Sequence, residues 1–141
     1  MIFSKTATAQ TPEADVRKVV DRLFDGMRSG DSAMVRSVFL KSNLFTSISK
    51  NATDSVIVRS DGDAEGFIRA VRTPRNEIWD EKISNVKIDI DGPMSVVWAP
   101  YKFYRGDTFS HCGVNVFILI HTVNGWKIRE ITDTRRKTDC P

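Results

Sequence analysis

The sequence predicts a single α+β domain in which helices come first and a curved antiparallel sheet follows. Apolar residues recur at helical three- and four-residue spacing in residues 12–39, whereas residues 94–140 are rich in β-prone side chains. Two glycine turns, Arg105–Thr108 and Val123–Trp126, divide this second region as in an antiparallel meander. We therefore expect the sheet to wrap around the first helix.

The predicted helices lie in the first half of the chain. The first has Thr11 as its N-cap and Pro12 in its first turn, and it ends at Gly30. Its apolar stripe comprises Val16, Val19, Val20, Leu23, Phe24 and Met27. A second, short helix is expected over residues 31–39. A third is expected over residues 61–73, where the following proline stops it.

The remaining segments are predicted to be strands. Residues 44–49 and 55–59 are expected to form two short strands around a turn. Residues 83–90 alternate between apolar and polar side chains, which predicts one strand with a single buried face. Long strands are then expected at residues 94–104, 109–122 and 125–135. The Asn-Gly pair before the last of these predicts a type I′ turn, because both residues tolerate a positive φ.

Composition limits the classes of partner. The chain has 141 residues, 40% of them hydrophobic, which suits one globular domain. Its net charge is +3, and the basic residues are dispersed except at residues 135–137, so no nucleic-acid partner is expected. No apolar run approaches the roughly 18 residues of a membrane span, so no membrane partner is expected. Two distant histidines and two cysteines are poor material for a metal site, and no cofactor is expected.

The first residues differ in character from the domain. We expect residues 1–11 to be a disordered leader or a signal-peptide remnant, and residues 12–141 to form the domain. Ala7-Thr8-Ala9 is similar to a signal-peptidase site, although no full apolar segment precedes it. The sequence thus favours a periplasmic or secreted protein, with a cytoplasmic location as the alternative.

Strand pairing across the two turns predicts which side chains share a face. A two-residue Asn-Gly turn places Asn115 opposite Thr134. The turn that follows Tyr104 places Trp98 near Asn115, so these side chains are expected on one face, with His111 nearer the rim. A β-bulge near residues 129–131 leaves the direction of the following side chains open.

The same pairing brings the two cysteines near each other. Cys112 is expected to face Lys137, only three residues before Cys140. A tail that turns at Thr138-Asp139 would bring the two sulfur atoms within disulfide range. In an exported chain we expect this bridge, whereas in a cytosolic chain both cysteines would be free thiols.

Several segments together resemble the nuclear transport factor 2-like superfamily. They are Trp79–Glu81, Val97–Tyr104, His111–Asn115, Gly125–Ile128 and Asp133–Arg136. More narrowly, the chain is similar to the bacterial branch named for lumazine binding, close to the SnoaL-like proteins, from Glu13 to Cys140. The resemblance implies a cystatin-like cone, with N-terminal helices packed in a curved, mostly antiparallel sheet. It also implies a blind cavity and a homodimer formed through the outer face of the sheet.

The implied cavity has a set of candidate residues. The side chains expected to bind a ligand are Trp98, Tyr101, Asn115, Phe24 and Phe67. In an enzyme, His111 or Asp133 would transfer protons, since an ordinary histidine titrates near pH 6.5. The structural alternatives are a His111 bonded to a neighbouring carbonyl, and an Asp133 paired with Arg135 or Arg136. At the pocket mouth, Asp133 with either arginine could instead position a substrate carboxylate. Asp80 and Glu81 also lie near the sheet, but no apolar run flanks either of them.

Three interpretations of function remain. The first is a protein that binds a small, partly apolar organic molecule, since the sequence has no catalytic triad order, nucleophile elbow or phosphate loop. The second is an enzyme of the isomerase, dehydratase or polyketide-cyclase kind, because the superfamily uses one pocket for many tasks. The third is an interaction module whose cavity is filled by its own side chains.

Overall fold

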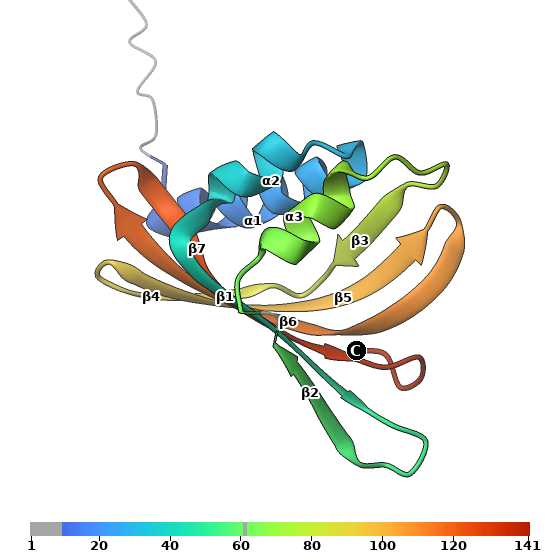
Figure 1. The fold of residues 1–141 in the computed structure, drawn as a ribbon. Helices are drawn as coiled ribbons and strands as arrows, with labels where there is room; N and C mark the ends of the chain where they lie inside the picture. The colour runs from blue at the N-terminus through green and yellow to red at the C-terminus, as the bar shows by residue number, and fades with distance from the viewer. Residues whose placement is uncertain (1–9, 61) are drawn as a thin grey trace, which may run out of the picture.

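The computed structural model describes residues 10–60 and 62–141. Residues 1–9, which hold most of the predicted leader, and Asp61 lie outside the described residues. The described chain forms three helices and a seven-stranded sheet. All three helices lie on one side of the sheet, as Figure 1 shows.

The helices begin and end where local signals place them. In α1 (Pro12–Ser29) the N-cap Thr11 accepts a hydrogen bond from the Ala14 amide at 3.2 Å, and Gly30 closes the helix with φ 69°. Helix α2 (Ser32–Val38) has Asp31 as its N-cap. Helix α3 (Glu65–Arg72) is shorter than the predicted 61–73, because the Asp63 carboxylate accepts from the Glu65 amide and fixes a turn there.

The sheet is mostly antiparallel. Its strands are β1 (Phe39–Lys50), β2 (Val56–Ser60), β3 (Trp79–Ile83), β4 (Lys87–Asp91), β5 (Met94–Arg105), β6 (Thr108–Thr122) and β7 (Gly125–Arg135). Their order is β2-β1-β7-β6-β5-β3, and β4 also pairs with β5. Only the described pair β1–β7 is parallel. The predicted class, helices before a curved antiparallel sheet, is confirmed.

The prediction of one strand over residues 83–90 is wrong. This segment is divided between β3 and β4, which pair with different halves of β5. Between them the Ser84 amide bonds to the Pro100 carbonyl at 2.9 Å, and Asn85 takes a φ of 49°. Pro100 has no N–H to donate, so the β5 ladder is interrupted opposite this point.

The register of the last three strands also differs from the prediction. The β6–β7 turn consists of Val123 and Asn124, with Gly125 paired to Thr122 at φ 89°, so the type I′ prediction is wrong. The β-bulge predicted near residues 129–131 is present, with Arg129 as the extra residue on β7. After both shifts Asn115 faces Asp133 instead of Thr134.

A second bulge overturns the predicted direction of Trp98. It lies between Phe103 and Tyr104, where Ser110 is the extra residue on β6. Trp98 therefore pairs with Val116 rather than Asn115. A register shift of one residue moves a side chain to the other face of the sheet. Trp98 therefore points outward and is 49% exposed.

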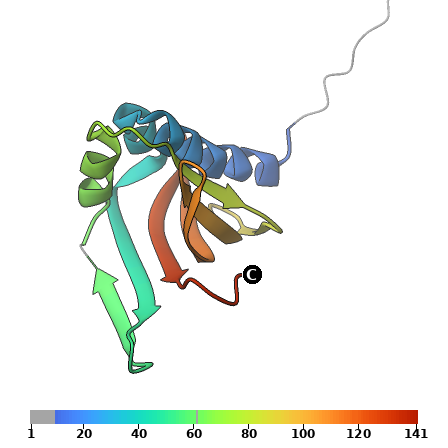
Figure 2. The same ribbon diagram turned by 90° about the vertical axis from the view of Figure 1, so that its right-hand side faces the viewer.

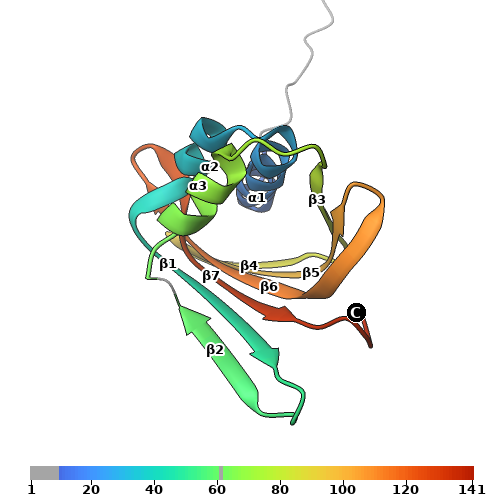
Figure 3. The same cartoon turned by 45° about the vertical axis from the view of Figure 1, so that its right-hand side comes forward.

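The core lies between the helices and the concave face of the sheet. Figures 2 and 3 show α1 running across this hollow face, with the β1–β2 hairpin projecting beyond it. The Phe24 ring of α1 meets Phe117 of β6 edge-on at 6.2 Å. At Gly26 a Cβ would lie 2.8 Å from a Val35 methyl group, so α1 and α2 pack closely only because this residue is glycine. No helix within residues 10–60 and 62–141 has the length and apolar character to cross a membrane.

Candidate functional site

A cavity of 440 Å³ lies between α1, α3 and the concave face of the sheet. Its aromatic wall consists of Phe24, Phe45, Phe67, Trp79, Phe103 and Phe117. Phe45 of β1 stacks on Phe67 of α3, with ring centroids 5.5 Å apart, which joins the sheet to the helical wall. The volume falls within the range of about 300–1,000 Å³ that small-molecule sites occupy.

Polar side chains meet at one end of this cavity. They are Glu81 of β3, His111 and Asn115 of β6, and Asp133 and Arg135 of β7. Asn115 and Asp133 are direct partners in the β6–β7 ladder, so their side chains share the inner face. Both are buried, with 4% and 6% exposure.

Glu81 is the group whose chemistry the cavity changes most. Its Oε1 accepts a hydrogen bond of 2.6 Å from Asn115 Nδ2. The pKa of Glu81 is raised to about 7, chiefly by burial and also by the nearby charge of Asp133, while the Asn115 bond opposes the shift. A carboxyl that titrates near neutral pH can both take up and release a proton.

Replacing Glu81 with glutamine is expected to stabilise the protein at pH 8. The raised pKa means that, between about pH 4.5 and 7, the folded state binds a proton that the unfolded state has lost. Stability therefore falls as pH rises through this window, by an amount on the order of 3 kcal/mol. In Glu81→Gln this loss is absent.

Urea unfolding at several pH values measures the difference in the free energy of unfolding between Glu81→Gln and the wild type. The difference should be small below pH 4.5 and reach its maximum above pH 7. Glu77→Gln is a suitable control, because Glu77 is exposed and its carboxylate stays hydrated in both states. A Glu81→Gln difference that does not change with pH would contradict the assignment.

Asp133 and Arg135 form an ion pair beside Glu81. Arg135 Nη2 lies 3.2 Å from Asp133 Oδ2, and its Nε lies 3.3 Å from Oδ1. The Asp133 side chain is only 7% exposed, whereas that of Arg135 is 43% exposed. The ion pair that the sequence offered as an alternative for Asp133 is thus present, and its partner is Arg135.

His111 is neutral in the folded protein at neutral pH. Its ring is half-buried against Phe103, with centroids 5.0 Å apart, and edge-on to Tyr101 at 5.7 Å. Burial, followed by the positive charge of Arg135, lowers the pKa of His111 to about 4. Its Nδ1 lies 3.0 Å from Ser110 Oγ, so a hydroxyl and not a carbonyl is its partner.

The structure brings together five of the predicted site residues. Phe24, Phe67, His111, Asn115 and Asp133 all line the cavity. The prediction for Trp98 is wrong, because it lies on the outer face of the sheet.

Tyr101 is also placed differently from the prediction. It is buried, with 2% exposure, and is not among the cavity-lining residues. Its hydroxyl instead donates to the Thr134 carbonyl oxygen at 2.7 Å. Tyr101 of β5 is therefore bonded to β7 and does not face the cavity.

From the sequence, Glu81 and Trp79 are not predicted to line the cavity, whereas Arg135 is predicted at the pocket mouth as a candidate partner of Asp133. The side chains around Glu81 come from α1, β6 and β7. The residues next to Glu81 in the sequence therefore do not indicate that it is buried. The signal that could have found it is its place in β3: Glu81 pairs with Phe103, whose side chain is also in the cavity wall.

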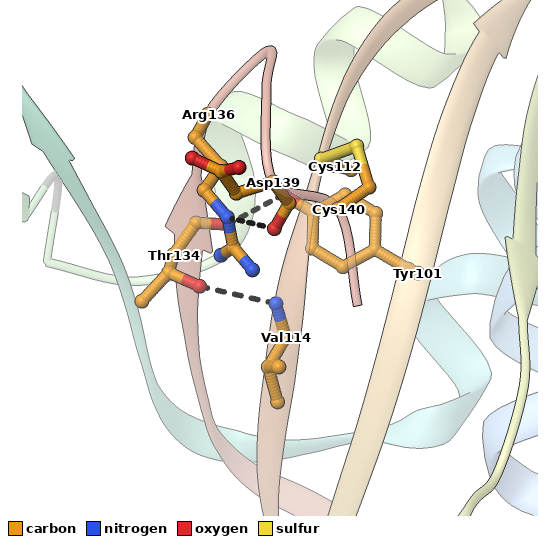
Figure 4. The surroundings of a disulfide bond; sticks show 7 residues. All are labelled: Tyr101, Cys112, Val114, Thr134, Arg136, Asp139 and Cys140. Carbon is orange, nitrogen blue, oxygen red and sulfur yellow. Dashed lines mark hydrogen bonds between the residues drawn. A yellow bond between two sulfur atoms is a disulfide. The ribbon is translucent and has the colours of Figure 1, made fainter.

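Cys112 and Cys140 form a disulfide at the edge of this region (Figure 4). Their Cα atoms are 5.7 Å apart. Cys112 also exchanges backbone hydrogen bonds of 2.8 and 2.9 Å with Arg136, one residue from the predicted partner Lys137. The bond therefore fixes the last residues of the chain against β6. In residues 10–60 and 62–141, no group of three or more potential ligands could hold a metal ion.

Comparison with known proteins identifies the fold. No family model matches the sequence, and no curated protein matches it. Solved structures do match: a nuclear transport factor 2-like protein from Cytophaga hutchinsonii has a TM-score of 0.69 at 14% identity, covering 90% of this chain and 100% of that one.

Two further structures are similar. One from Novosphingobium aromaticivorans, described as having a cystatin-like fold, has a TM-score of 0.69 at 9% identity, over 91% of this chain and 84% of that one. One from Streptomyces avermitilis, described as a candidate dehydratase, has a TM-score of 0.61 at 16% identity, over 89% and 99%. The chain thus has the nuclear transport factor 2-like, cystatin-like fold.

Proposed function

We propose that this protein binds a small, partly apolar organic molecule in the cavity between α1, α3 and the sheet. The observation that carries the proposal is a 440 Å³ space with an aromatic wall and a polar group at one end. Sites for small molecules combine mostly apolar walls with a few convergent polar side chains. The open volume argues against the third interpretation, an interaction module with a filled cavity.

Ala70→Phe is expected to abolish binding, because Ala70 of α3 lines the cavity and a phenyl ring there would occupy it. Native mass spectrometry of protein purified without harsh washing should show a bound small molecule on the wild type and none on this variant. Arg69→Phe is the matched control, since Arg69 is exposed on the same helix outside the cavity lining. Equal ligand on Ala70→Phe and the wild type would contradict the proposal.

An enzyme of the isomerase, dehydratase or cyclase kind is the second candidate. One observation favours it: Glu81 faces the cavity and has a pKa of about 7, which suits a general acid or base. This assignment replaces Asp133, which is paired with Arg135, and His111, whose pKa of about 4 makes it a weak base. Conversion of a cyclic ketone or polyketide that is lost in Glu81→Gln would favour the enzyme, whereas a ligand recovered unchanged would favour the binding protein.

The narrower family and the location are also proposals. The narrower family is the bacterial branch named for lumazine binding, close to the SnoaL-like proteins, and the sequence resemblance from Glu13 to Cys140 supports it. A periplasmic or secreted location is supported by the disulfide, since such bonds persist in oxidising compartments.

We further propose that the protein is a homodimer formed through the outer face of the sheet. Met94, Val96 and Trp98 of β5 are exposed there by 47%, 36% and 49%. Their cross-strand partners on β6 are Ile120, Ile118 and Val116, so the apolar surface is continuous. Apolar patches of this kind commonly mark an interface between proteins.

Trp98→Asp is expected to convert a dimer to a monomer, because it would place a charge in the middle of this apolar surface. Sedimentation at micromolar concentration measures the change. Val58→Asp is the control, since Val58 is 62% exposed on β2, away from β5. A wild type that sediments as a strict monomer would contradict the proposal.

A further inference from the structure

A second hollow, of 670 Å³, adjoins the cavity. It lies at the ends of β1 and β7, and it shares Ser110, His111 and Arg135 with the cavity lining. The charged side chains that line it are Lys50, Arg135, Arg136 and Lys137, all of them basic. We call these four residues the basic vestibule.

Much of the positive charge of the basic vestibule is not neutralised. Lys50 and Arg135 have the acidic partners Asp54 and Asp133. Arg136 instead donates to the backbone oxygen of Asp139 at 2.9 Å. A backbone carbonyl is uncharged, so this bond does not neutralise the positive charge of Arg136. In the described part of the chain, no carboxylate forms an ion pair with Arg136 or Lys137.

The disulfide holds these cations in position. Arg136 is bonded through its backbone to Cys112, and Cys112 is covalently joined to Cys140 beyond it. Figure 4 shows Arg136 on this closed tail, beside the disulfide. Groups fixed before binding lose less conformational entropy when a ligand arrives, so they bind it more strongly.

The cavity differs from the vestibule in its charges. Carboxylates line the cavity as well as arginines, namely Asp63, Glu81 and Asp133 beside Arg105 and Arg135, whereas no carboxylate of the described residues lines the vestibule. A negatively charged group is therefore favoured at the vestibule over the cavity, where the carboxylates offset the two arginines. The two hollows together provide an apolar chamber for one end of a molecule and a cationic entrance for the other.

We propose that the ligand is an amphiphilic anion, with a flat apolar body in the cavity and an oxyanion group, such as a carboxylate or phosphate, at the basic vestibule. This inference rests on the proposed function, because it describes the ligand of the same cavity. Arginine and lysine side chains bind such groups through charge-assisted hydrogen bonds. The neutral His111 ring between the two hollows is placed to contact the junction of body and anion.

Two probes that differ in charge but not in shape test the inference. They are 2-naphthoate and 2-naphthamide, titrated by calorimetry into the full-length protein. The wild type is expected to bind 2-naphthoate about tenfold more tightly than 2-naphthamide. In the double variant Arg136→Gln/Lys137→Gln this preference should disappear, with the affinity for 2-naphthamide unchanged. Lys18→Gln/Arg22→Gln on the exposed side of α1 removes the same charge elsewhere and should retain the preference.

Each other outcome counts against a stated claim. Equal binding of both probes by the wild type would overturn the anionic ligand but leave the cavity as a binding site. An equal loss of both probes in Arg136→Gln/Lys137→Gln, or the same loss in the α1 control, would overturn the role of the vestibule. If neither probe binds the wild type, the proposed function itself is contradicted.

Discussion

Gly113→Ala is expected to destabilise the protein by more than about 4 kcal/mol. A Cβ at this position would lie 1.9 Å from the carbonyl oxygen of Thr134 and 2.7 Å from its carbonyl carbon. Both are backbone atoms, so no side-chain rotation can relieve the contact. The same oxygen accepts the hydrogen bond from the Tyr101 hydroxyl, which fixes it over β6.

Urea unfolding compares this variant with a second glycine substitution. Gly66→Ala is the control, because a Cβ there meets only the end of Arg69, at 3.9 Å. In a helix this change should stabilise by up to about 1 kcal/mol. A Gly113→Ala protein with the stability of the wild type would show that β7 does not approach β6 in this way.

Loss of the disulfide is expected to cost about 3–4 kcal/mol, from the chain entropy of a loop of this length. The bond joins residues 28 apart in sequence and holds the tail that carries Arg136 and Lys137. Cys140→Ser is the suitable variant, since Cys112 is fully buried and a hydroxyl there would add a desolvation cost. The reduced wild type should unfold at the same urea concentration as Cys140→Ser.

Thiol counting checks the bond itself. Under denaturing, non-reducing conditions, protein from its native compartment should contain no free thiol. Two free thiols would contradict the bond, and equal stability of the oxidised and reduced wild type would contradict its contribution to stability.

Elements with local signals were predictable from the sequence. Thr11, Pro12 and Gly30 determine the bounds of α1 through capping and backbone conformation, which depend on neighbouring residues only. The three long strands were likewise correct to within a residue or so, because each is bounded by a glycine turn or a proline.

The register was less predictable, because small shifts accumulate along a ladder. The bulges at Ser110 and near Arg129 each insert one residue. The bulge near Arg129 was predicted from the broken alternation of residues 129–131, whereas the bulge at Ser110 has no distinct sequence signal. The bulge at Ser110 reversed the predicted face of Trp98. The shift at Cys112 was only one residue, which the short tail before Cys140 accommodates, so the expected proximity of the cysteines still holds.

Burial of charged groups could not be predicted from local sequence at all. Glu81 lies between Asp80 and Lys82 in the chain, yet helix α1 and strands β6 and β7 enclose its carboxylate. Its raised pKa comes from this enclosure and from Asp133, which is 52 positions away. Such a site is defined by packing between distant segments.

The most direct test of the binding cavity is an NMR titration of the labelled protein with 2-naphthamide. The chain has three tryptophans, and they report on different places: Trp79 lines the cavity, Trp98 lies on the outer face and Trp126 is in the core. We predict shifts of the Trp79 indole N–H and the Asn115 side-chain amide, with Trp98 unchanged. Shifts confined to Trp98, or no shift at saturating probe, would contradict a ligand site between the helices and the sheet.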